Sequence, residues 1–405
     1  MQNNTPFANR PHIAFFGRRN AGKSSLVNAI TGQNLSIVSE IEGTTTDPVY
    51  KAMELLPLGP VVIIDTPGFD DSGDLGDKRV AKARQVLNKT DLAILVMDAS
   101  SGNTSFSSEK ELVNLFKAKN VPYIKVLNKI DLKLTDTDQN PVNSDTPLPV
   151  SAKTGYNINL LKEKIAAISV NEESLNKRLV ADLMQPLDLI VLVIPLDEAA
   201  PKGRLILPQQ QVIRDILEAG AVAIAVKDSE LDDLLKKLEK KPALVITDSQ
   251  VFAQVSAIVP LDVPLTSFSV LFARYKGFLE SAVKGVFALD SINDNDKVLI
   301  CEGCTHHRQC DDIGTVKIPR MIKSRFLKEP QFSFCTACDY PDDLKPYKLI
   351  IHCGGCMLNE REMLYRKRHA EEQNIPFTNY GIVIAHIQGI LKRSIEIFNL
   401  EFLNE

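Results

Sequence analysis

The chain has 405 residues, with 47 lysine or arginine and 51 aspartate or glutamate side chains, so its formal net charge is -4. At about 150 residues per domain, this length predicts two or three domains. The slightly acidic balance argues against nucleic acid or an anionic membrane as the main partner, because both favour basic surfaces. With 44% hydrophobic residues the composition excludes disordered and fibrous classes. Because no apolar run approaches membrane length and no secretory signal is visible, we expect a cytoplasmic protein that does not enter the membrane.

The first segment alternates short apolar runs with amphipathic stretches. Continuous apolar strands separated by helices are typical of a parallel sheet that is covered on both faces. We predict strands at 12–16, 61–65, 91–98 and 121–128, and helices at 22–31, 77–89, 108–118 and 157–168.

The alternation continues through the rest of the chain. In the middle segment we predict strands at 188–196, 221–226 and 242–249, and helices at 208–220, 229–240 and 250–258. The last segment has apolar runs at 297–300 and 347–351 and an expected amphipathic helix around 383–399. The sequence therefore predicts an α/β fold with three domains, at 1–172, 173–272 and 273–405.

A phosphate-binding loop lies between the first predicted strand and the first predicted helix. The run from Gly17 to Ser24 reads Gly-Arg-Arg-Asn-Ala-Gly-Lys-Ser and is followed by Ser25. The glycines Gly17 and Gly22 let the backbone wrap phosphates, and N–H groups at the helix start donate to them. Lys23 is expected to reach the β- and γ-phosphates, and the Ser24 hydroxyl to bind Mg²⁺. This loop predicts a Ras-like P-loop domain with a mainly parallel sheet.

Two further elements follow in the order that a nucleotide switch requires. Thr45, within the run Gly-Thr-Thr-Thr-Asp, is a candidate switch threonine and Mg²⁺ ligand. Asp65 ends a predicted strand and supplies an acidic group near Mg²⁺, and the N–H of Gly68 can sense the γ-phosphate. We therefore assign Lys23, Thr45, Asp65 and Gly68 to the hydrolytic machinery.

The last two elements of the first segment decide the base. Asn128, Lys129 and Asp131 form an Asn-Lys-x-Asp motif at a strand end, and Ser151 and Ala152 end the next run. The Asp131 carboxylate can accept two hydrogen bonds from N1–H and the exocyclic amine of guanine, a donor pair that adenine lacks. The backbone N–H groups of Ser151 and Ala152 are expected to face the guanine O6. The sequence therefore predicts GTP as the nucleotide.

The residue after Gly68 is Phe69, where Ras-like switches carry a glutamine that positions water, so we expect slow intrinsic hydrolysis. The loop and switch sequences resemble those of the tRNA-modification (TrmE) and Era-like GTPases. In several of these, the loop asparagine helps to bind a K⁺ that supplies the charge of an arginine finger. Asn20 matches that position, so the resemblance implies K⁺-stimulated activity.

All seven cysteines lie between Cys301 and Cys356, and six of them form three Cys-x-x-Cys pairs. In a cytoplasmic chain such clustering indicates metal chemistry rather than a disulfide framework. Three interpretations are open at this point. The pairs 335/338 and 353/356 have 14 residues between them, close to a zinc-ribbon spacing. The alternatives are an iron–sulfur cluster with a weak fourth ligand and a redox dithiol, for which three pairs are more than one exchange centre needs.

A Cys-x-His motif followed after a long gap by His-Cys-x-x-Cys resembles the signature of the FeFe-hydrogenase maturation GTPases, the HydF family. Here the motif reads Cys304-Thr-His306 and then His352-Cys353-Gly-Gly-Cys356. The order of GTPase, dimerisation and cluster domains matches as well, so the resemblance covers nearly the whole chain.

The resemblance implies that Cys304, Cys353 and Cys356 hold a 4Fe-4S cluster. His306 is then the candidate for the fourth, exchangeable position, and His352 a neighbour that tunes the cluster by hydrogen bonding. The cysteines outside the signature are interpreted as packing residues, with a second metal site as the alternative; they are Cys301, Cys310, Cys335 and Cys338. The basic run 361–369 is interpreted as a solvated helix face.

The resemblance further implies a GTP-switched scaffold and carrier. Such a protein accepts the diiron subcluster precursor from radical-SAM maturases and delivers it to an apo-FeFe-hydrogenase, as a homodimer joined through the middle domain. The alternative is an RNA-acting GTPase of the tRNA-modification type with a zinc-stabilised C-terminal domain, against which the acidic balance argues.

Overall fold

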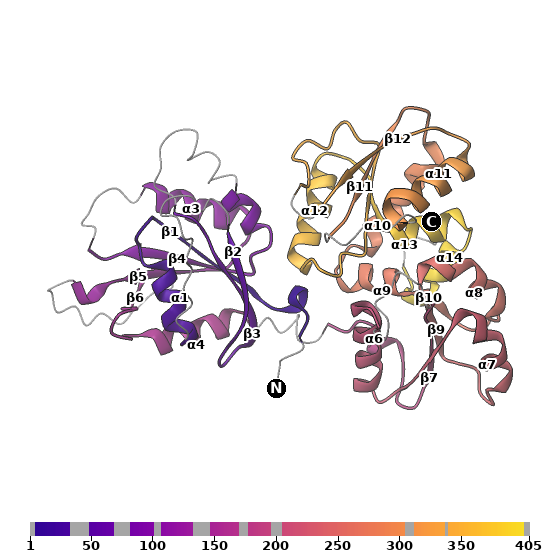
Figure 1. Cartoon of the computed structure of the whole chain (residues 1–405), viewed down its shortest axis with the longest axis horizontal. Helices are drawn as coiled ribbons and strands as arrows, with labels where there is room; N and C mark the ends of the chain where they lie inside the picture. The colour runs from indigo at the N-terminus through magenta and orange to yellow at the C-terminus, as the bar shows by residue number, and fades with distance from the viewer. Residues whose placement is uncertain are drawn as a thin grey trace. The chain divides into compact units, whose positions relative to one another are not determined.

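A computed structural model describes nine stretches of the chain. They are residues 5–32, 48–68, 82–100, 107–132, 146–169, 177–195, 205–303, 312–336 and 339–400. The chain divides into two compact units, Met1–Asn176 and Lys177–Glu405, which are drawn in Figure 1 and are considered separately below. The three-domain boundaries expected from the sequence stay a prediction. No helix of the described stretches is long and apolar enough to span a membrane.

The first unit is built on a six-stranded sheet of order β2-β3-β1-β4-β5-β6. Its strands are β1 (His12–Gly17), β2 (Val49–Leu55), β3 (Gly59–Asp65), β4 (Leu92–Asp98), β5 (Tyr123–Asn128) and β6 (Leu148–Pro149). All neighbours are parallel except β2 and β3. The sequence analysis missed β2, because this edge strand is only half-buried and lacks a continuous apolar run.

Helices cover both faces of this sheet. They are α1 (Lys23–Thr31), α3 (Ser107–Ala118), α4 (Ile158–Ser169) and a helical stretch at 82–87. Successive residues of β1 point to opposite faces, so Ile13 belongs to the core under α1 and α4, and Ala14 to the core under α3. This two-sided burial explains why the parallel strands of the unit are continuously apolar, and it confirms the predicted P-loop α/β architecture.

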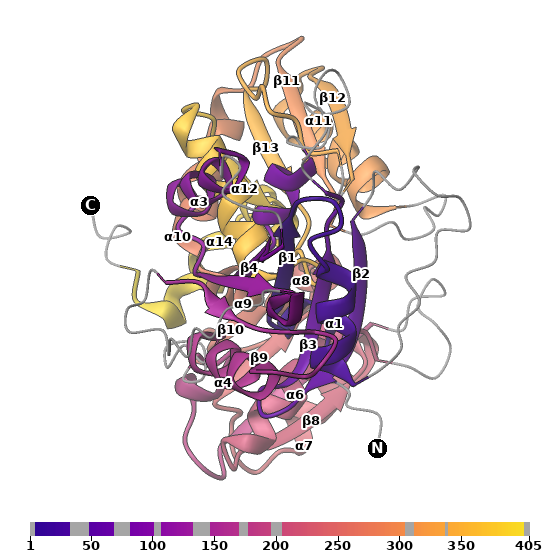
Figure 2. The same cartoon turned by 90° about the vertical axis from the view of Figure 1, so that its left-hand side faces the viewer.

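The second unit contains two four-stranded parallel sheets, of order β10-β9-β7-β8 and β12-β11-β13-β14. The first comprises β7 (Leu189–Val193), β8 (Val222–Val226), β9 (Leu244–Thr247) and β10 (Leu265–Ser267). The second comprises β11 (Lys297–Cys301), β12 (Gln331–Cys335), β13 (Leu349–His352) and β14 (Phe377–Asn379). The two sheets lie at opposite ends of the unit, with α9, α10 and α14 between them (Figures 1 and 2).

One hydrophobic core joins these two sheets, since buried residues of β7, β9, β11 and β13 belong to the same cluster. The helices of the unit are α6 (Leu207–Glu218), α7 (Leu231–Lys237), α8 (Phe252–Ile258), α9 (Phe268–Tyr275), α10 (Leu279–Val286), α11 (Ile318–Phe326), α12 (Glu360–Glu372), α13 (Tyr380–Ile387) and α14 (Leu391–Ile395).

The single amphipathic helix predicted around 383–399 is wrong. The structure has the two helices α13 and α14 there, and the chain turns between them at Gly389, whose φ is 73°. This left-handed conformation suits glycine and ends a helix. Helix α13 is buried along most of its length, because it packs in the core between the sheets.

Candidate functional site

The phosphate loop connects the end of β1 to the start of α1. Gly17 has a φ of 148° and Gly22 a φ of 87°, and an added Cβ at Gly17 would lie 2.2 Å from the Val96 carbonyl oxygen. The Lys23 ammonium donates to the carbonyls of Gly17 at 3.1 Å and Arg18 at 2.9 Å. The lysine is therefore held inside the turn, from which its charge can meet phosphate oxygens.

Asn128 ties this loop to the end of β5. Its Nδ2 donates to the Ala21 carbonyl at 3.1 Å, and its Oδ1 accepts from the backbone N–H of Ala152 at 3.1 Å. An added Cβ at Gly22 would lie 2.3 Å from Asn128 Nδ2, so only glycine allows this contact. The buried asparagine thus connects the phosphate loop with the Ser151–Ala152 turn.

The Mg²⁺ side of the site contains Ser24 and Asp65. Ser24 Oγ donates to Asp65 Oδ2 at 2.8 Å, while Asp65 Oδ1 is buried and has no hydrogen-bond partner among the described residues. Burial raises the pKa of Asp65, against the opposing effects of Ser24 and Lys23. A buried, unsatisfied carboxylate oxygen beside a serine hydroxyl fits a hard divalent cation such as Mg²⁺.

Other residues predicted on this side have mixed outcomes. An added Cβ at Gly68 would lie 2.6 Å from the backbone nitrogen of Arg19, so this glycine touches the phosphate loop. Asn20 is in the loop with a φ of 60°, a conformation that asparagine tolerates. Thr45 and Phe69 lie outside the described residues.

The base side brings Asp131, Ser151 and Lys129 together. Ser151 Oγ donates to Asp131 Oδ1 at 2.6 Å and accepts from the backbone N–H of Thr154 at 3.1 Å. Lys129 Nζ pairs with Asp98 Oδ2 at 2.6 Å, which fixes the lysine stem beside the loop. The Ser151 hydroxyl thus orients the Asp131 carboxylate, which is the acceptor predicted to recognise guanine.

The cysteines lie where parallel strands of the second unit end. Cys301 of β11 is in register with Cys335 of β12 on one side and with His352 of β13 on the other. Because carboxyl ends of parallel strands meet at one edge of a sheet, all three side chains and the following Cys353 are gathered there. The 301 and 353 regions therefore converge at one edge of this sheet.

Cys353 sits in a nest of backbone donors. Its Sγ accepts from the N–H of Gly303 at 3.0 Å and of Gly355 at 3.4 Å, and its own N–H donates to the Cys301 carbonyl at 2.8 Å. Burial raises the pKa of the Cys353 and Cys356 thiols, against the effect of these amides on Cys353 and of Lys276 on Cys356. Backbone N–H groups aimed at a cysteine sulfur suit a thiolate that binds iron.

The remaining signature residues are not placed. Cys304 and His306 lie outside the described residues, as do Cys310 and Cys338. Within the described ranges, no three histidine, cysteine, aspartate or glutamate side chains are grouped closely enough to hold a metal ion. The structure therefore positions two of the expected cluster ligands, Cys353 and Cys356.

Cys301 and Cys335 form a separate thiol pair in the sheet. Their sulfur atoms are 2.8 Å apart, and both residues are buried. Burial and the contact with Cys335 raise the pKa of Cys301, whereas the hydrogen bond between the two thiols lowers the pKa of Cys335. Both side chains belong to the core of the unit, as a packing role requires.

His352 is held from both of its ring nitrogens. Its Nδ1 donates to the Cys353 carbonyl at 2.8 Å, and its Nε2 lies 2.9 Å from Arg366 Nη1. A guanidinium can only donate, so Nε2 accepts and the imidazole is neutral. Burial and the Arg366 charge lower the pKa of His352 to about 3. With both nitrogens engaged, His352 supports the cysteine loop as a hydrogen-bonding neighbour.

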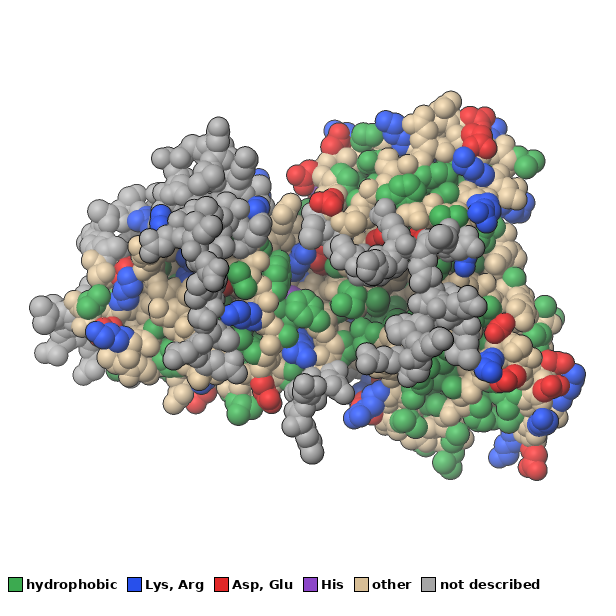
Figure 3. All heavy atoms as spheres, viewed as in Figure 1, with side chains coloured by type: hydrophobic (Ala, Val, Ile, Leu, Met, Phe, Trp, Pro, Cys, Tyr) green, Lys and Arg blue, Asp and Glu red, His purple; other side chains and the backbone are tan. Residues whose placement is uncertain are grey.

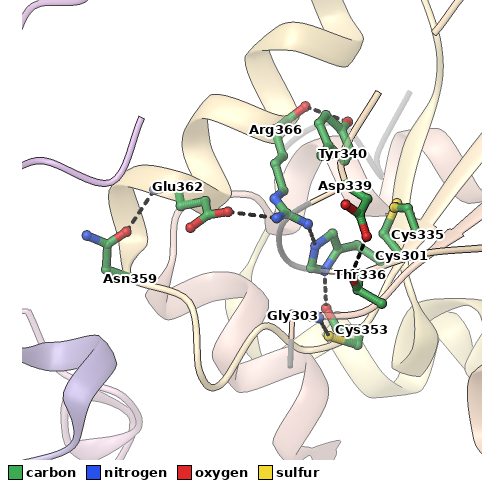
Figure 4. Close-up of polar contacts among 11 residues, drawn as sticks. Cys301, Gly303, Cys335, Thr336, Asp339, Tyr340, Cys353, Asn359, Glu362 and Arg366 are labelled. Carbon is green, nitrogen blue, oxygen red and sulfur yellow. Dashed lines mark hydrogen bonds and ion pairs between the residues drawn. The ribbon is translucent and has the colours of Figure 1, made fainter. Parts of the chain in front are cut away.

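Arg366 is the residue that the sequence analysis misread. It lies in the basic run 361–369, yet it is 1% exposed, so the interpretation of that run as a solvated face is wrong for this position. Figure 4 shows Arg366 reaching from α12 toward the strand ends. Its Nη2 donates to Glu362 Oε1 at 2.7 Å. The spacing of these two residues by four positions was a signal for a helical ion pair.

Lys276 is a second residue that the sequence analysis missed. Its ammonium is buried and donates to the carbonyls of Gly355 and Leu358, next to Cys356. Burial lowers the pKa of Lys276 to about 8, against the opposing effect of Cys356 and Cys353. A single lysine far away in the sequence carries no motif that indicates this contact.

Taken together, the phosphate loop, the carboxylate on the Mg²⁺ side and the oriented Asp131 define a GTP-hydrolysing protein of the P-loop class. Three family models match the chain. Residues 12–129 match the 50S ribosome-binding GTPase, 179–277 the hydrogen maturase F dimerization domain and 280–397 the hydrogen maturase F tetramerization domain. The two hydrogen maturase F models together cover more than half of the chain. The chain belongs to the hydrogen maturase F (HydF) family of hydrogenase-maturation GTPases.

Curated relatives share the GTPase part. A tRNA modification GTPase MnmE of Methylococcus capsulatus is 35% identical over 150 residues, which are 37% of this chain and 32% of the relative. That of Legionella pneumophila (strain Corby) is 40% identical over 159 residues, 38% of this chain and 34% of the relative. The chain thus spans about a third of the length of these relatives.

Two solved structures are similar to part of the chain. Aquifex aeolicus Era bound to GDP and AlF₄⁻ is 20% identical, covering 53% of this chain and 92% of that one with a TM-score of 0.34. The G domain of T. maritima FeoB is 26% identical, covering 40% and 99% with a TM-score of 0.31.

Proposed function

We propose that this protein is a GTP-switched scaffold that holds a 4Fe-4S cluster and carries the diiron subcluster precursor to an apo-FeFe-hydrogenase. The observation that carries the proposal is the Cys353 sulfur, which accepts backbone hydrogen bonds from Gly303 and Gly355 in a loop that also holds Cys356. Radical-SAM maturases are the proposed source of the precursor. The proposed location is the cytoplasm.

In this proposal Cys304, Cys353 and Cys356 ligate the cluster, and His306 is the candidate for the fourth position. The cluster supplies an iron whose fourth ligand can be exchanged. The chain's own contribution is to fix the Cys353 loop through the carbonyl of Cys301, the backbone amides and His352. A site with only three thiolates leaves room for cargo to enter and leave.

The GTPase unit gates this exchange. Lys23 and the loop N–H groups bind the phosphates, while Ser24, Thr45 and Asp65 organise Mg²⁺. Asn20 is the proposed K⁺ ligand. Because Phe69 occupies the position of the glutamine that positions water in Ras-like switches, hydrolysis is slow without that ion. A nucleotide changes partner affinity only through contacts that differ between its bound states. Gly68 is the proposed sensor of the γ-phosphate, and its close approach to Arg19 of the phosphate loop supports this role.

The proposed assembly is a homodimer formed at the free edge of the first sheet of the second unit. Strand β8 is the edge strand, and Val222 is 44% exposed there. Leu217 at the end of α6 is 58% exposed, and Figure 3 shows hydrophobic side chains at the surface near β7. An apolar strand edge invites pairing with another strand, and residues 179–277 match a dimerization domain.

The proposal is tested by the iron and acid-labile sulfide content of anaerobically reconstituted protein, with EPR after reduction. We expect about four irons and four sulfides per chain in the wild type and a large loss in Cys353→Ser. Cys335→Ser is the matched control, because Cys335 is buried in the same sheet but lies outside the signature, and it should keep the cluster.

One tightly held zinc and no reducible cluster would overturn the proposal. The likeness to the MnmE proteins, 35–40% over the GTPase part, favours RNA-linked action as the second candidate. A zinc-loaded protein that retains RNA in a pull-down would support that candidate, whereas an iron-loaded protein without RNA affinity excludes it.

A further inference from the structure

Lys276 connects two parts of the second unit that are far apart in the sequence. It is the C-cap residue of α9 and is 2% exposed. Its Nζ donates to the carbonyl of Gly355 and, at 2.7 Å, to that of Leu358. These two carbonyls flank Cys356, so the ammonium holds both sides of the cysteine loop. Lys276 lies at the end of the dimerization-domain match, and the loop lies in the tetramerization-domain match.

No carboxylate forms a direct ion pair with Lys276 among the residues that the structure describes. Glu360 and Glu362 act on its charge only from beyond that distance. Among the described residues of the second unit, the other buried lysine or arginine is Arg366, which has Glu362 at 2.7 Å; the exposed Lys284 has Glu280 at 2.7 Å. A buried ammonium that meets only neutral carbonyls is costly, because these replace only part of its hydration. Its position therefore calls for a negative group in the cysteine loop.

We propose that Lys276 is a positioning residue of the cluster site, whose ammonium holds the Cys353–Cys356 loop and neutralises part of the negative charge of thiolate-bound iron. This inference rests on the proposed cluster function. Three thiolates give such a cluster a net negative charge, which grows when an electron is added. A fixed positive charge behind the loop therefore favours both retention of the cluster and its reduction.

The test compares the midpoint potential and the rate of iron loss to a chelator in reconstituted wild type and variants. Lys276→Met removes the charge and both donors. We expect an about tenfold less favourable reduction, which is ~59 mV for one electron, and an about tenfold faster loss of iron. Lys276→Gln keeps a hydrogen-bond donor but not the charge. Its midpoint potential should therefore fall as far as that of Lys276→Met, while it should lose iron more slowly than Lys276→Met. Lys276→Arg should restore the potential.

Lys284→Met is the matched control, because Lys284 is exposed on the neighbouring helix α10 and pairs with Glu280; both readouts should stay at the wild-type values. If the wild type holds no reducible cluster, the proposed function itself is overturned, independently of the Lys276 variants. A reducible wild-type cluster whose potential and iron loss are unchanged in Lys276→Met overturns only the role of Lys276. If circular dichroism shows that Lys276→Met is unfolded, equal potentials in Lys276→Gln and Lys276→Arg overturn it instead.

Discussion

Asp65 shows how a single residue is adapted to its ligand at the expense of stability. Burial raises its pKa above 3.8 in the native state. Its contribution to stability is therefore fully present below that value and is lost as the pH rises through the raised native pKa. At neutral pH the protein keeps a buried carboxylate whose Oδ1 has no partner among the described residues. In the proposed function this carboxylate meets Mg²⁺ when the nucleotide binds.

We expect Asp65→Asn to increase the free energy of unfolding of the nucleotide-free protein at pH 7 by up to ~1 kcal/mol, and to weaken Mg²⁺·GTP binding at least tenfold. Urea unfolding and titration with a fluorescent GTP analogue check the two effects. The stability gain should shrink as the pH falls, because Asp65 itself becomes protonated. Asp98→Asn is the opposite control, because the pKa of Asp98 is lowered and its charged form pairs with Lys129; this variant should be less stable at pH 7.

Asp131 provides a second prediction at the scale of one residue. Its carboxylate, oriented by Ser151, offers two acceptors to the two donors of guanine. Asp131→Asn replaces one acceptor with a donor, which matches the carbonyl at C2 of xanthine. We expect GTP affinity to fall by about a hundredfold or more and xanthosine triphosphate to bind better than GTP. Competition binding measures the switch, and Ser151→Ala should weaken GTP binding without reversing the preference.

At the scale of an element, the loop after β13 depends on one of its two glycines. Gly355 has a φ of 62°, and an added Cβ would lie 2.6 Å from the buried Met363 Sδ. Gly354 has no atom within 4 Å of an added Cβ and needs no left-handed backbone. The two neighbours thus form a matched pair in which only the second is required by the geometry of the loop.

We expect Gly355→Ala to reduce the free energy of unfolding of the second unit by about 1–2 kcal/mol and to accelerate iron loss. Gly354→Ala should stay within about 0.5 kcal/mol of the wild type. Denaturant unfolding of the two variants checks this prediction. Equal effects of the two substitutions would show that the left-handed conformation of Gly355 is not what shapes the loop.

At the scale of the whole molecule, the exposed edge strand β8 predicts the assembly. We expect Val222→Lys to convert a dimer into a monomer at micromolar concentration, because a charge at the strand edge opposes pairing. Size-exclusion chromatography with light scattering measures the mass. Leu261→Lys is the control, since Leu261 is 90% exposed but precedes β10, the opposite edge of the sheet. A dimer that survives Val222→Lys would place the interface elsewhere.

The sequence by itself determined the GTPase chemistry, because the residues from Gly17 to Ser24 are contiguous and act mainly through their own backbone. The alternation of apolar strands and helices was equally visible, since two-sided burial makes central parallel strands continuously apolar. It could not predict the edge strands β2 and β12, whose half-exposed residues leave no apolar run. The break between α13 and α14 also escaped it, because both helices are buried by the fold around them.

Only the tertiary structure decided what surrounds the cysteine loop. The spacing of Cys353 and Cys356 indicates a metal site. Arg366, in contrast, looks like any other basic residue in the sequence, and only the fold shows that α12 places it against His352. Lys276 meets the Gly355 carbonyl across a separation of 79 residues, and nothing local to either residue indicates that contact. Burial and charge compensation arise when distant segments pack together, so these supporting residues become visible only in the folded chain.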